Sequence, residues 1–242
     1  MTSRPRGPAA STLILVCIWA GAWVMPASAA GRPVTLVSQD GTALVGSFFE
    51  AEDRPSPGVV LVHMLHRSRS DWDEIGSRLA SAGISALAID LRGHGGSAGS
   101  ADALSEMAGD VRSAVQWLSA RPDVRPDAIG VAGGSLGANL ALIVAADVPA
   151  IRAVAALSPS LDYRGVRVGL DVMRRIGDRP VWLASSTEDP YALRTLKDLM
   201  EGGSGPREQY LSTSTAHGTK LLTTDGTLAT TLVDWLRQRL LS

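Results

Sequence analysis

Cysteine is almost absent from this sequence, whose 242 residues include one, Cys17. A single thiol excludes a disulfide scaffold, a zinc site built from cysteines and an iron–sulfur cluster. Histidine is also scarce, with four residues, so a histidine-rich metal site would need nearly all of them. The three Tyr and two Phe leave few rings for a surface that stacks nucleic-acid bases.

Neither sign of charge dominates the sequence. Lys and Arg number 23 and Asp and Glu 24, which gives a formal net charge of −1. Nucleic-acid-binding domains usually carry a basic excess, so we expect no nucleic-acid partner. With 45% hydrophobic and 19% charged residues, the chain can bury a full core and is not of the disordered class. An ordinary globular enzyme or binding domain remains.

The first thirty residues have the three-part pattern of a secretory signal peptide. Two arginines near the start are followed by an apolar run over 13–25 and by small residues at 27–30. We expect cleavage after Ala29 or Ala30, which leaves 31–242 as an exported domain, periplasmic or secreted, with no stable membrane partner. The alternative is an uncleaved N-terminal anchor, although the run is short of the roughly 20 apolar residues that span a bilayer.

Predicted strands alternate with predicted helices after this leader. A hairpin around the Asp40-Gly41 turn comes first, and short apolar runs typical of strands buried on both faces follow it. This order predicts one α/β domain, with a mostly parallel sheet covered by helices on both faces. The predicted strands after the hairpin cover 59–63, 84–89, 128–132, 151–157, 180–185 and 208–211, and the predicted helices cover 71–82, 104–118, 136–146, 191–200 and 227–240.

A Gly-x-Ser-x-Gly run lies where one predicted strand passes into a helix, and its serine is Ser135. A sharp turn at this place projects the serine above the sheet, and the small residues Gly133 and Gly137 let the backbone pass without collision. The same pattern arises by chance in glycine-rich turns, where the serine has no function. Ser135 is therefore a candidate nucleophile that needs partners.

A serine hydroxyl becomes a nucleophile when a base accepts its proton. In this kind of turn the acid and then the histidine follow the serine along the chain. His217 is the only histidine after Ser135, and it follows the last predicted strand. The acid should follow the strand before that one, where Glu188 and Asp189 stand together. We favour Asp189 for its short side chain, with Glu188 as the alternative and Asp162 as a weaker third candidate.

Acyl transfer also needs N–H donors for the charge that develops on the carbonyl oxygen. We expect one donor to be the backbone N–H of Leu136, directly after the candidate nucleophile. The second should come from the loop after the 59–62 strand segment, where Leu65 is preferred and Met64 is the alternative.

Two of the remaining histidines, His63 and His94, are predicted to be structural. His63 and His66 stand three apart, but they lie in a loop without an adjacent carboxylate cluster, so we expect no metal there. We expect His63 to pack or hydrogen-bond beneath the oxyanion loop. In the loop that follows the 84–89 strand, we expect Asp90 and Arg92 to brace neighbouring turns and His94 to be structural.

The sequence resembles the α/β-hydrolase superfamily in its small dienelactone-hydrolase-like or esterase form. The resemblance implies an eight-stranded, mostly parallel sheet and a serine hydrolase without a cofactor. Two departures accompany it: family members often carry His-Gly where this chain has His63-Met64, and dienelactone hydrolases proper use Cys at Ser135. The matching elements, in the expected order, are His63-Met64-Leu65, the 90–95 loop, the run at 133–137, Glu188-Asp189 and His217-Gly218.

These observations predict an exported serine hydrolase that cleaves a small carboxylic ester through Ser135, Asp189 and His217. The segment 158–179 is too short for a large cap domain, and we expect its first residues to form the rim of an open site. A thioesterase or peptidase would use the same residues, and a non-catalytic binding protein can have the same fold.

Overall fold

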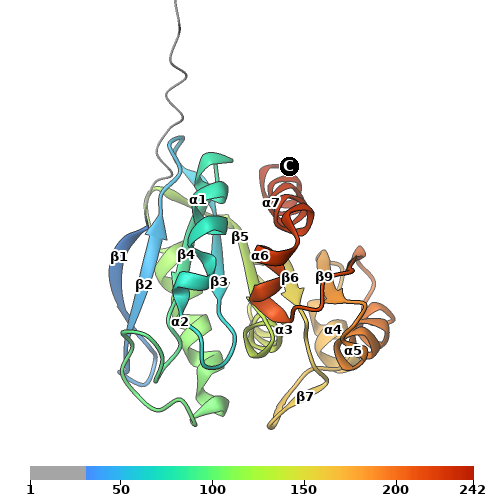
Figure 1. The fold of residues 1–242 in the computed structure, drawn as a ribbon. Helices are drawn as coiled ribbons and strands as arrows, with labels where there is room; N and C mark the ends of the chain where they lie inside the picture. The colour runs from blue at the N-terminus through green and yellow to red at the C-terminus, as the bar shows by residue number, and fades with distance from the viewer. Residues whose placement is uncertain (1–30) are drawn as a thin grey trace, which may run out of the picture.

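The computed structural model describes residues 31–242 (Figure 1). The expected signal peptide at 1–30, its cleavage after Ala29 or Ala30 and the alternative anchor lie outside the described residues. Between residues 31 and 242, no helix is long and apolar enough to cross a membrane.

An eight-stranded sheet forms the centre of the described chain, in the order β1-β2-β4-β3-β5-β6-β9-β10. The hairpin β1–β2 and the pair β2–β4 are antiparallel, and all other neighbours in this sheet are parallel. Both the N-terminal hairpin and the mostly parallel sheet were expected from the sequence. The strands are β1 Arg32–Val37, β2 Ala43–Phe49, β3 Ser56–Val62, β4 Ser85–Ile89, β5 Val124–Gly134, β6 Ile151–Leu157, β9 Val181–Ser186 and β10 Arg207–Ser212.

Helices cover both faces of the sheet because its central strands are apolar on both sides. Every residue of β3 and β4 is buried. Along β3, Val59 and Leu61 pack in one core cluster and Val60 and Val62 in the other, which is the period of two that a strand imposes. The first cluster includes α1 Asp73–Ser81, α6 Leu221–Thr224 and α7 Gly226–Leu241, and the second includes α2 Met107–Ser119, α3 Leu136–Asp147, α4 Leu170–Ile176 and α5 Pro190–Met200.

The segment 158–179 forms a small hairpin, β7 Asp162–Tyr163 with β8 Val166–Arg167, and then α4. It contains no cap domain, as expected. Asn139 of α3 is fully buried and anchors the hairpin: its side-chain N–H groups donate to the carbonyls of Ser160 and Val166 at 2.7 and 2.8 Å, and its carbonyl accepts from Ser160 N–H at 3.0 Å. In Figure 1 the β7 hairpin extends from the end of the molecule opposite the C-terminus.

The predicted strand boundaries differ most from the structure at the start of β5. β5 begins at Val124, four residues before the predicted start at Ala128, although Pro126 lies between them. In the pairing of β5 with β3, Val124 lies opposite Ser56 and the next pair is Ile129 opposite Gly58, so residues 125–128 are left out of this ladder, and the pairing with β6 begins only at Ile129. A proline is tolerated in such a place because no regular ladder bond from its nitrogen is required.

Candidate active site

Ser135 occupies a sharp turn between β5 and α3. Its backbone has φ 51° and ψ −116°, a conformation uncommon for a residue with a side chain. The neighbouring glycines make the turn possible. A Cβ on Gly133 would lie 2.1 Å from the carbonyl oxygen of Gly137, and a Cβ on Gly137 would lie 2.4 Å from that of Val62. Larger residues at positions 133 and 137 would collide with the backbone, so the sharp turn that positions Ser135 requires both glycines.

His217 and Asp189 complete a chain of hydrogen bonds to this serine. His217 Nε2 lies 2.9 Å from Ser135 Oγ, and His217 Nδ1 lies 2.6 Å from Asp189 Oδ2. The three residues follow β5, β9 and β10, so the sheet brings their loops together at the carboxyl ends of parallel strands. A carboxylate facing Nδ1 keeps the proton on that nitrogen, which leaves Nε2 free to accept the serine proton.

The other two candidate acids lie elsewhere. Glu188 is exposed, and its backbone N–H donates to Ser186 Oγ at 2.9 Å. Asp162 pairs with Arg167 at 2.7 Å within the β7–β8 hairpin, and this hydrogen bond lowers the pKa of Asp162. Asp189 has a second function, because its Oδ1 accepts the N–H of Ala192 at 3.0 Å and so caps the N-terminus of α5.

Small polar residues that the sequence analysis did not single out hold these loops. Ser158, at the end of β6, has a positive φ of 52° and accepts the backbone N–H of Gly218 on its Oγ at 3.0 Å. Ser186 donates its hydroxyl to the carbonyl of Ser214, which ties the loop of Asp189 to the loop of His217. The sequence did offer a signal for these residues, because Ser158 and Ser186 each directly follow a predicted strand.

The expected oxyanion donors are the backbone N–H groups of Leu136, which directly follows Ser135, and of Leu65, in the loop after β3. Leu136 is the first residue of α3, where a helix has N–H groups without an internal partner. Among residues 31–242, neither Leu65 nor Leu136 donates its backbone N–H to another protein group. Met64 lies close to the serine, because both side chains adjoin Gly218. A Cβ added to Gly218 would lie 2.9 Å from Met64 Sδ and 3.4 Å from Ser135 Cβ.

His63 and His94 are buried and bonded to backbone groups, as a structural role predicts. His63 Nδ1 lies 2.7 Å from the Met64 carbonyl oxygen, so this histidine does bond beneath the loop that contains Leu65. Burial lowers the pKa of His63 to about 4. The part of the chain that the structure describes contains no group of three His, Cys, Asp or Glu side chains placed to hold a metal ion.

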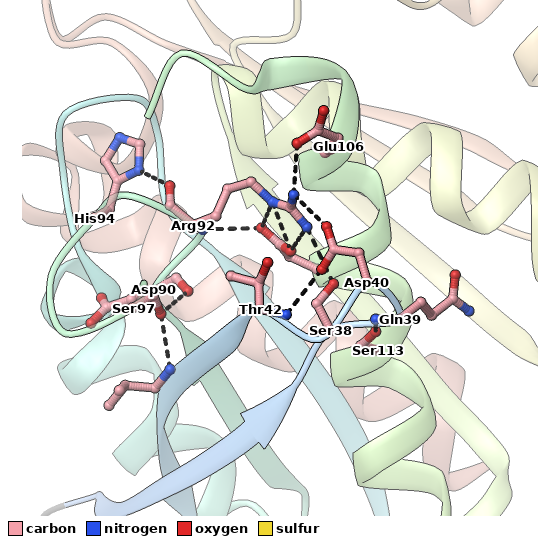
Figure 2. A network of polar contacts seen from close by, with 12 residues as sticks. Ser38, Gln39, Asp40, Thr42, Asp90, Arg92, His94, Ser97, Glu106 and Ser113 are labelled. Atoms are coloured by element: carbon pink, nitrogen blue, oxygen red, sulfur yellow. Dashed lines mark hydrogen bonds and ion pairs between the residues drawn. The ribbon is translucent and has the colours of Figure 1, made fainter. Parts of the chain in front are cut away.

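Arg92 braces the turns around it, as expected (Figure 2). Its guanidinium donates to the buried Asp110 at 2.6 Å and to the more exposed Asp40 and Glu106 at 2.7 and 2.8 Å. These bonds lower the pKa of Asp40 to about 2 and raise the pKa of Arg92. The loop after β4 is thereby joined to α2 and to the β1–β2 turn.

Asp90 braces the loop in the same way. It is fully buried, forms an ion pair with Arg69 and accepts the backbone N–H groups of Arg69 and Gly96 at 2.7 and 2.9 Å. A Cβ on Gly95 would overlap the Asp90 carboxylate, so that position requires a glycine. The loop after β3 and the loop after β4 are therefore fixed to each other.

A large surface groove lies beside α5, away from the candidate nucleophile. It has a volume of about 740 Å³ and runs along α5 and β10, with Pro190, Met200 and Gln209 in its lining. Ser135 and His217 do not line it. We place the candidate site at Ser135, His217 and Asp189, because their hydrogen bonds can activate a nucleophile.

Two uncharacterised proteins have sequences similar to part of this chain. An uncharacterised protein of Mycobacterium tuberculosis is 37% identical over 121 residues, which cover 50% of this chain and 43% of that protein. The uncharacterised protein YfhR of Salmonella typhimurium is 29% identical over 157 residues, covering 58% of this chain and 53% of YfhR. The matched part thus spans about half the length of these relatives.

Solved structures with the same fold include enzymes. A dienelactone hydrolase from Anabaena variabilis superposes with a TM-score of 0.73 at 18% identity, covering 87% of this chain and 98% of that one. An esterase from Pyrococcus furiosus gives a TM-score of 0.71 at 20% identity, with coverage of 87% and 91%. The model of the family described as serine aminopeptidase, S33, matches residues 53–194. Because this match covers more than half of the sequence, the chain belongs to that family of α/β hydrolases.

Proposed function

We propose that this hydrolase cleaves small carboxylic esters, with Ser135 as nucleophile, His217 as general base and then acid, and Asp189 as the orienting acid. The observation that carries the proposal is the continuous hydrogen-bond chain from Asp189 through His217 to Ser135, at 2.6 and 2.9 Å. We also propose that residues 1–30 direct export, on the pattern of the sequence.

The first half of the reaction forms an acyl-enzyme. Ser135 Oγ attacks the ester carbonyl carbon as His217 Nε2 takes its proton. The negative charge on the carbonyl oxygen is met by the backbone N–H groups of Leu136 and Leu65, with Met64 as the alternative second donor. The intermediate then collapses, and the leaving alkoxide receives the proton from His217 and departs as an alcohol.

The second half hydrolyses that acyl-enzyme. Water loses a proton to His217 Nε2 and attacks the acyl carbon, and collapse returns the proton to Ser135 while the carboxylic acid leaves. Asp189 stabilises the imidazolium in both halves, which its short contact with Nδ1 favours. We propose no cofactor or metal for these steps.

A small ester suits the open surroundings of the site. The segment 158–179 forms only the β7–β8 hairpin and α4, and the His217 side chain is 45% exposed. A peptidase is the second candidate, because the family model that matches the chain is described as a serine aminopeptidase. Thioester cleavage needs the same groups. A non-catalytic binding role is disfavoured because all three side chains are in hydrogen-bonding positions.

Labelling of the full chain with a fluorophosphonate probe, followed by intact mass, tests the nucleophile. We expect one adduct per chain in the wild type and none in Ser135→Ala or His217→Ala. Turnover of an ester, thioester and peptide panel then identifies the leaving group, and Ser135→Ala should lower kcat on the order of 10⁶-fold. An adduct that persists in Ser135→Ala would contradict the assignment.

The orienting acid is tested by a matched pair of neighbouring substitutions. Asp189→Asn should lower kcat by about 10⁴-fold, the size of effect that this change has in other serine triads. Glu188→Gln removes the adjacent exposed charge and should leave kcat within about twofold, since its carboxylate does not contact His217. A large loss in Glu188→Gln with an active Asp189→Asn would exchange the two roles.

A further inference from the structure

Two buried histidines bond to the backbone on both sides of Leu65, and the proposed reaction uses neither. His63 Nδ1 lies 2.7 Å from the Met64 carbonyl oxygen, and His63 Nε2 lies 3.0 Å from the Leu91 backbone nitrogen. His94 Nε2 lies 3.1 Å from the backbone nitrogen of His66, and its Nδ1 lies 2.9 Å from the carbonyl oxygen of Arg92, a contact drawn in Figure 2.

These partners determine where the ring protons are. The backbone N–H groups of Leu91 and His66 can only donate, so Nε2 of both histidines must accept. Each Nδ1 faces a carbonyl oxygen and must carry the proton. His63 and His94 are therefore both neutral and in the same tautomer. Their ring centroids lie 5.1 Å apart, a distance at which two positive rings would repel each other.

The pKa of His63 agrees with this arrangement. Its ring is fully buried, and burial lowers the pKa to about 4. Within this net shift, burial is the largest cause and the nearby His94 acts in the same direction, whereas the bond to the Met64 carbonyl and the carboxylates of Asp90 and Asp71 oppose the shift without reversing it.

Geometry connects these rings to the expected oxyanion donor. The Met64 carbonyl and the Leu65 N–H belong to one planar peptide unit, so a bond that holds the oxygen also fixes the direction of the N–H. His63 holds that oxygen, and the backbone N–H of Arg67 holds it as well, at 3.2 Å. The next peptide unit, from Leu65 to His66, is held through the His66 N–H by His94.

We propose that His63 and His94 are positioning residues that aim the Leu65 N–H at the carbonyl oxygen of the substrate. The inference rests on the proposed function, which supplies the reaction that the donor serves. His94 is the more informative of the two, because its ring joins the loop after β3 to the Arg92 carbonyl. Arg92 is in turn fixed by the buried Asp110. The network of Figure 2 thus supports the proposed oxyanion loop.

Two substitutions of His94 separate positioning from simple packing. Glutamine is long enough to place an amide oxygen near the position of Nε2, where it can accept the His66 N–H. Asparagine keeps an N–H near the position of Nδ1 for the Arg92 carbonyl, but it is too short to reach His66. The two variants share the amide group and differ in the one bond that matters to the proposal.

The measurements are kcat, KM and Tm of the full chain with p-nitrophenyl acetate. Misplacement of a reacting group by about 1 Å can cost about 10²-fold, so we expect His94→Asn to lower kcat by about 10- to 100-fold with KM within about twofold. His94→Gln should keep kcat within about threefold of the wild type, at a Tm close to that of His94→Asn. Equal kcat values for the two variants, or a His94→Asn enzyme as fast as the wild type, would overturn the proposal.

A second readout does not depend on turnover. Long-range ¹H–¹⁵N spectra of the Ser135→Ala protein at neutral pH should show His63 and His94 protonated on Nδ1 alone. A ring protonated on Nε2 would overturn the arrangement on which the proposal rests. A wild type inert to ester and fluorophosphonate would contradict the proposed function, whereas an active wild type with an unaffected His94→Asn would contradict only the role of the histidines.

Discussion

Because His63 is buried, the free energy of unfolding should fall as the pH is lowered through a defined range. The ordinary pKa of the side chain is 6.5 and its pKa in the folded protein is about 4. Since each pKa unit is worth 1.36 kcal/mol, this difference corresponds to about 3 kcal/mol of free energy of unfolding. The ring is fully buried, so little of this value is lost to solvent screening.

The sign follows from which state binds the proton. Between pH 6.5 and about 4 the unfolded chain takes up a proton on His63 and the folded chain does not. The free energy of unfolding therefore falls as the pH falls through this window. The stabilisation is complete above pH 6.5, and below about 4 both states bind the proton, so this residue causes no further loss.

Urea unfolding followed by far-UV circular dichroism measures the effect, with His63→Asn as the reference. Asparagine keeps an N–H donor for the Met64 carbonyl and does not titrate, so other ionisable groups cancel in the comparison. The excess stability of the wild type over the variant should shrink by about 3 kcal/mol from neutral pH to about pH 4. Parallel curves for the two proteins would refute the assignment of a neutral, buried ring.

Two further predictions concern buried polar groups. Asp110→Ala removes the buried partner of Arg92, a residue that is 3% exposed, and should lower the free energy of unfolding by about 3 kcal/mol. Glu106→Gln changes an exposed carboxylate and should lower it by less than about 1 kcal/mol. Equal losses for the two variants in urea unfolding would contradict this difference. Asn139→Ala should cost about 2–4 kcal/mol, because it removes three hydrogen bonds of a fully buried side chain, and should speed proteolysis within the β7–β8 hairpin. An unchanged proteolysis pattern would show that this side chain does not anchor the hairpin.

The sheet was predictable because its strands carry their own signal. Buried parallel strands are short apolar runs, and residues 59–62 and 151–157 lie within β3 and β6 as found. The hairpin β7–β8 and the helix α4 were not predicted as elements. They are short, and long-range bonds such as those of Asn139 stabilise the hairpin, so no local periodicity marks it.

The candidate site was predictable to the level of chain order. The run around Ser135 and the single downstream histidine indicated two of the three candidate residues. The adjacent Glu188 and Asp189 could not be separated by residue type alone, because both are acids. A cue was present, since Asp before Pro190 is a helix-start signal and a capping side chain has a fixed direction. The ring protons of His63 and His94 were beyond sequence reasoning, because they depend on backbone groups in distant loops.

The position of β10 at the edge of the sheet has a consequence for partial opening of the molecule. His217 follows this strand, which pairs with β9 alone, whereas Ser135 follows β5, which has a neighbour on each side. Fluctuations that detach an edge strand need less free energy than global unfolding. Such an opening would withdraw His217 while the sheet beneath Ser135 stays intact. The arrangement that the proposed chemistry needs is therefore less stable than the fold that supports it.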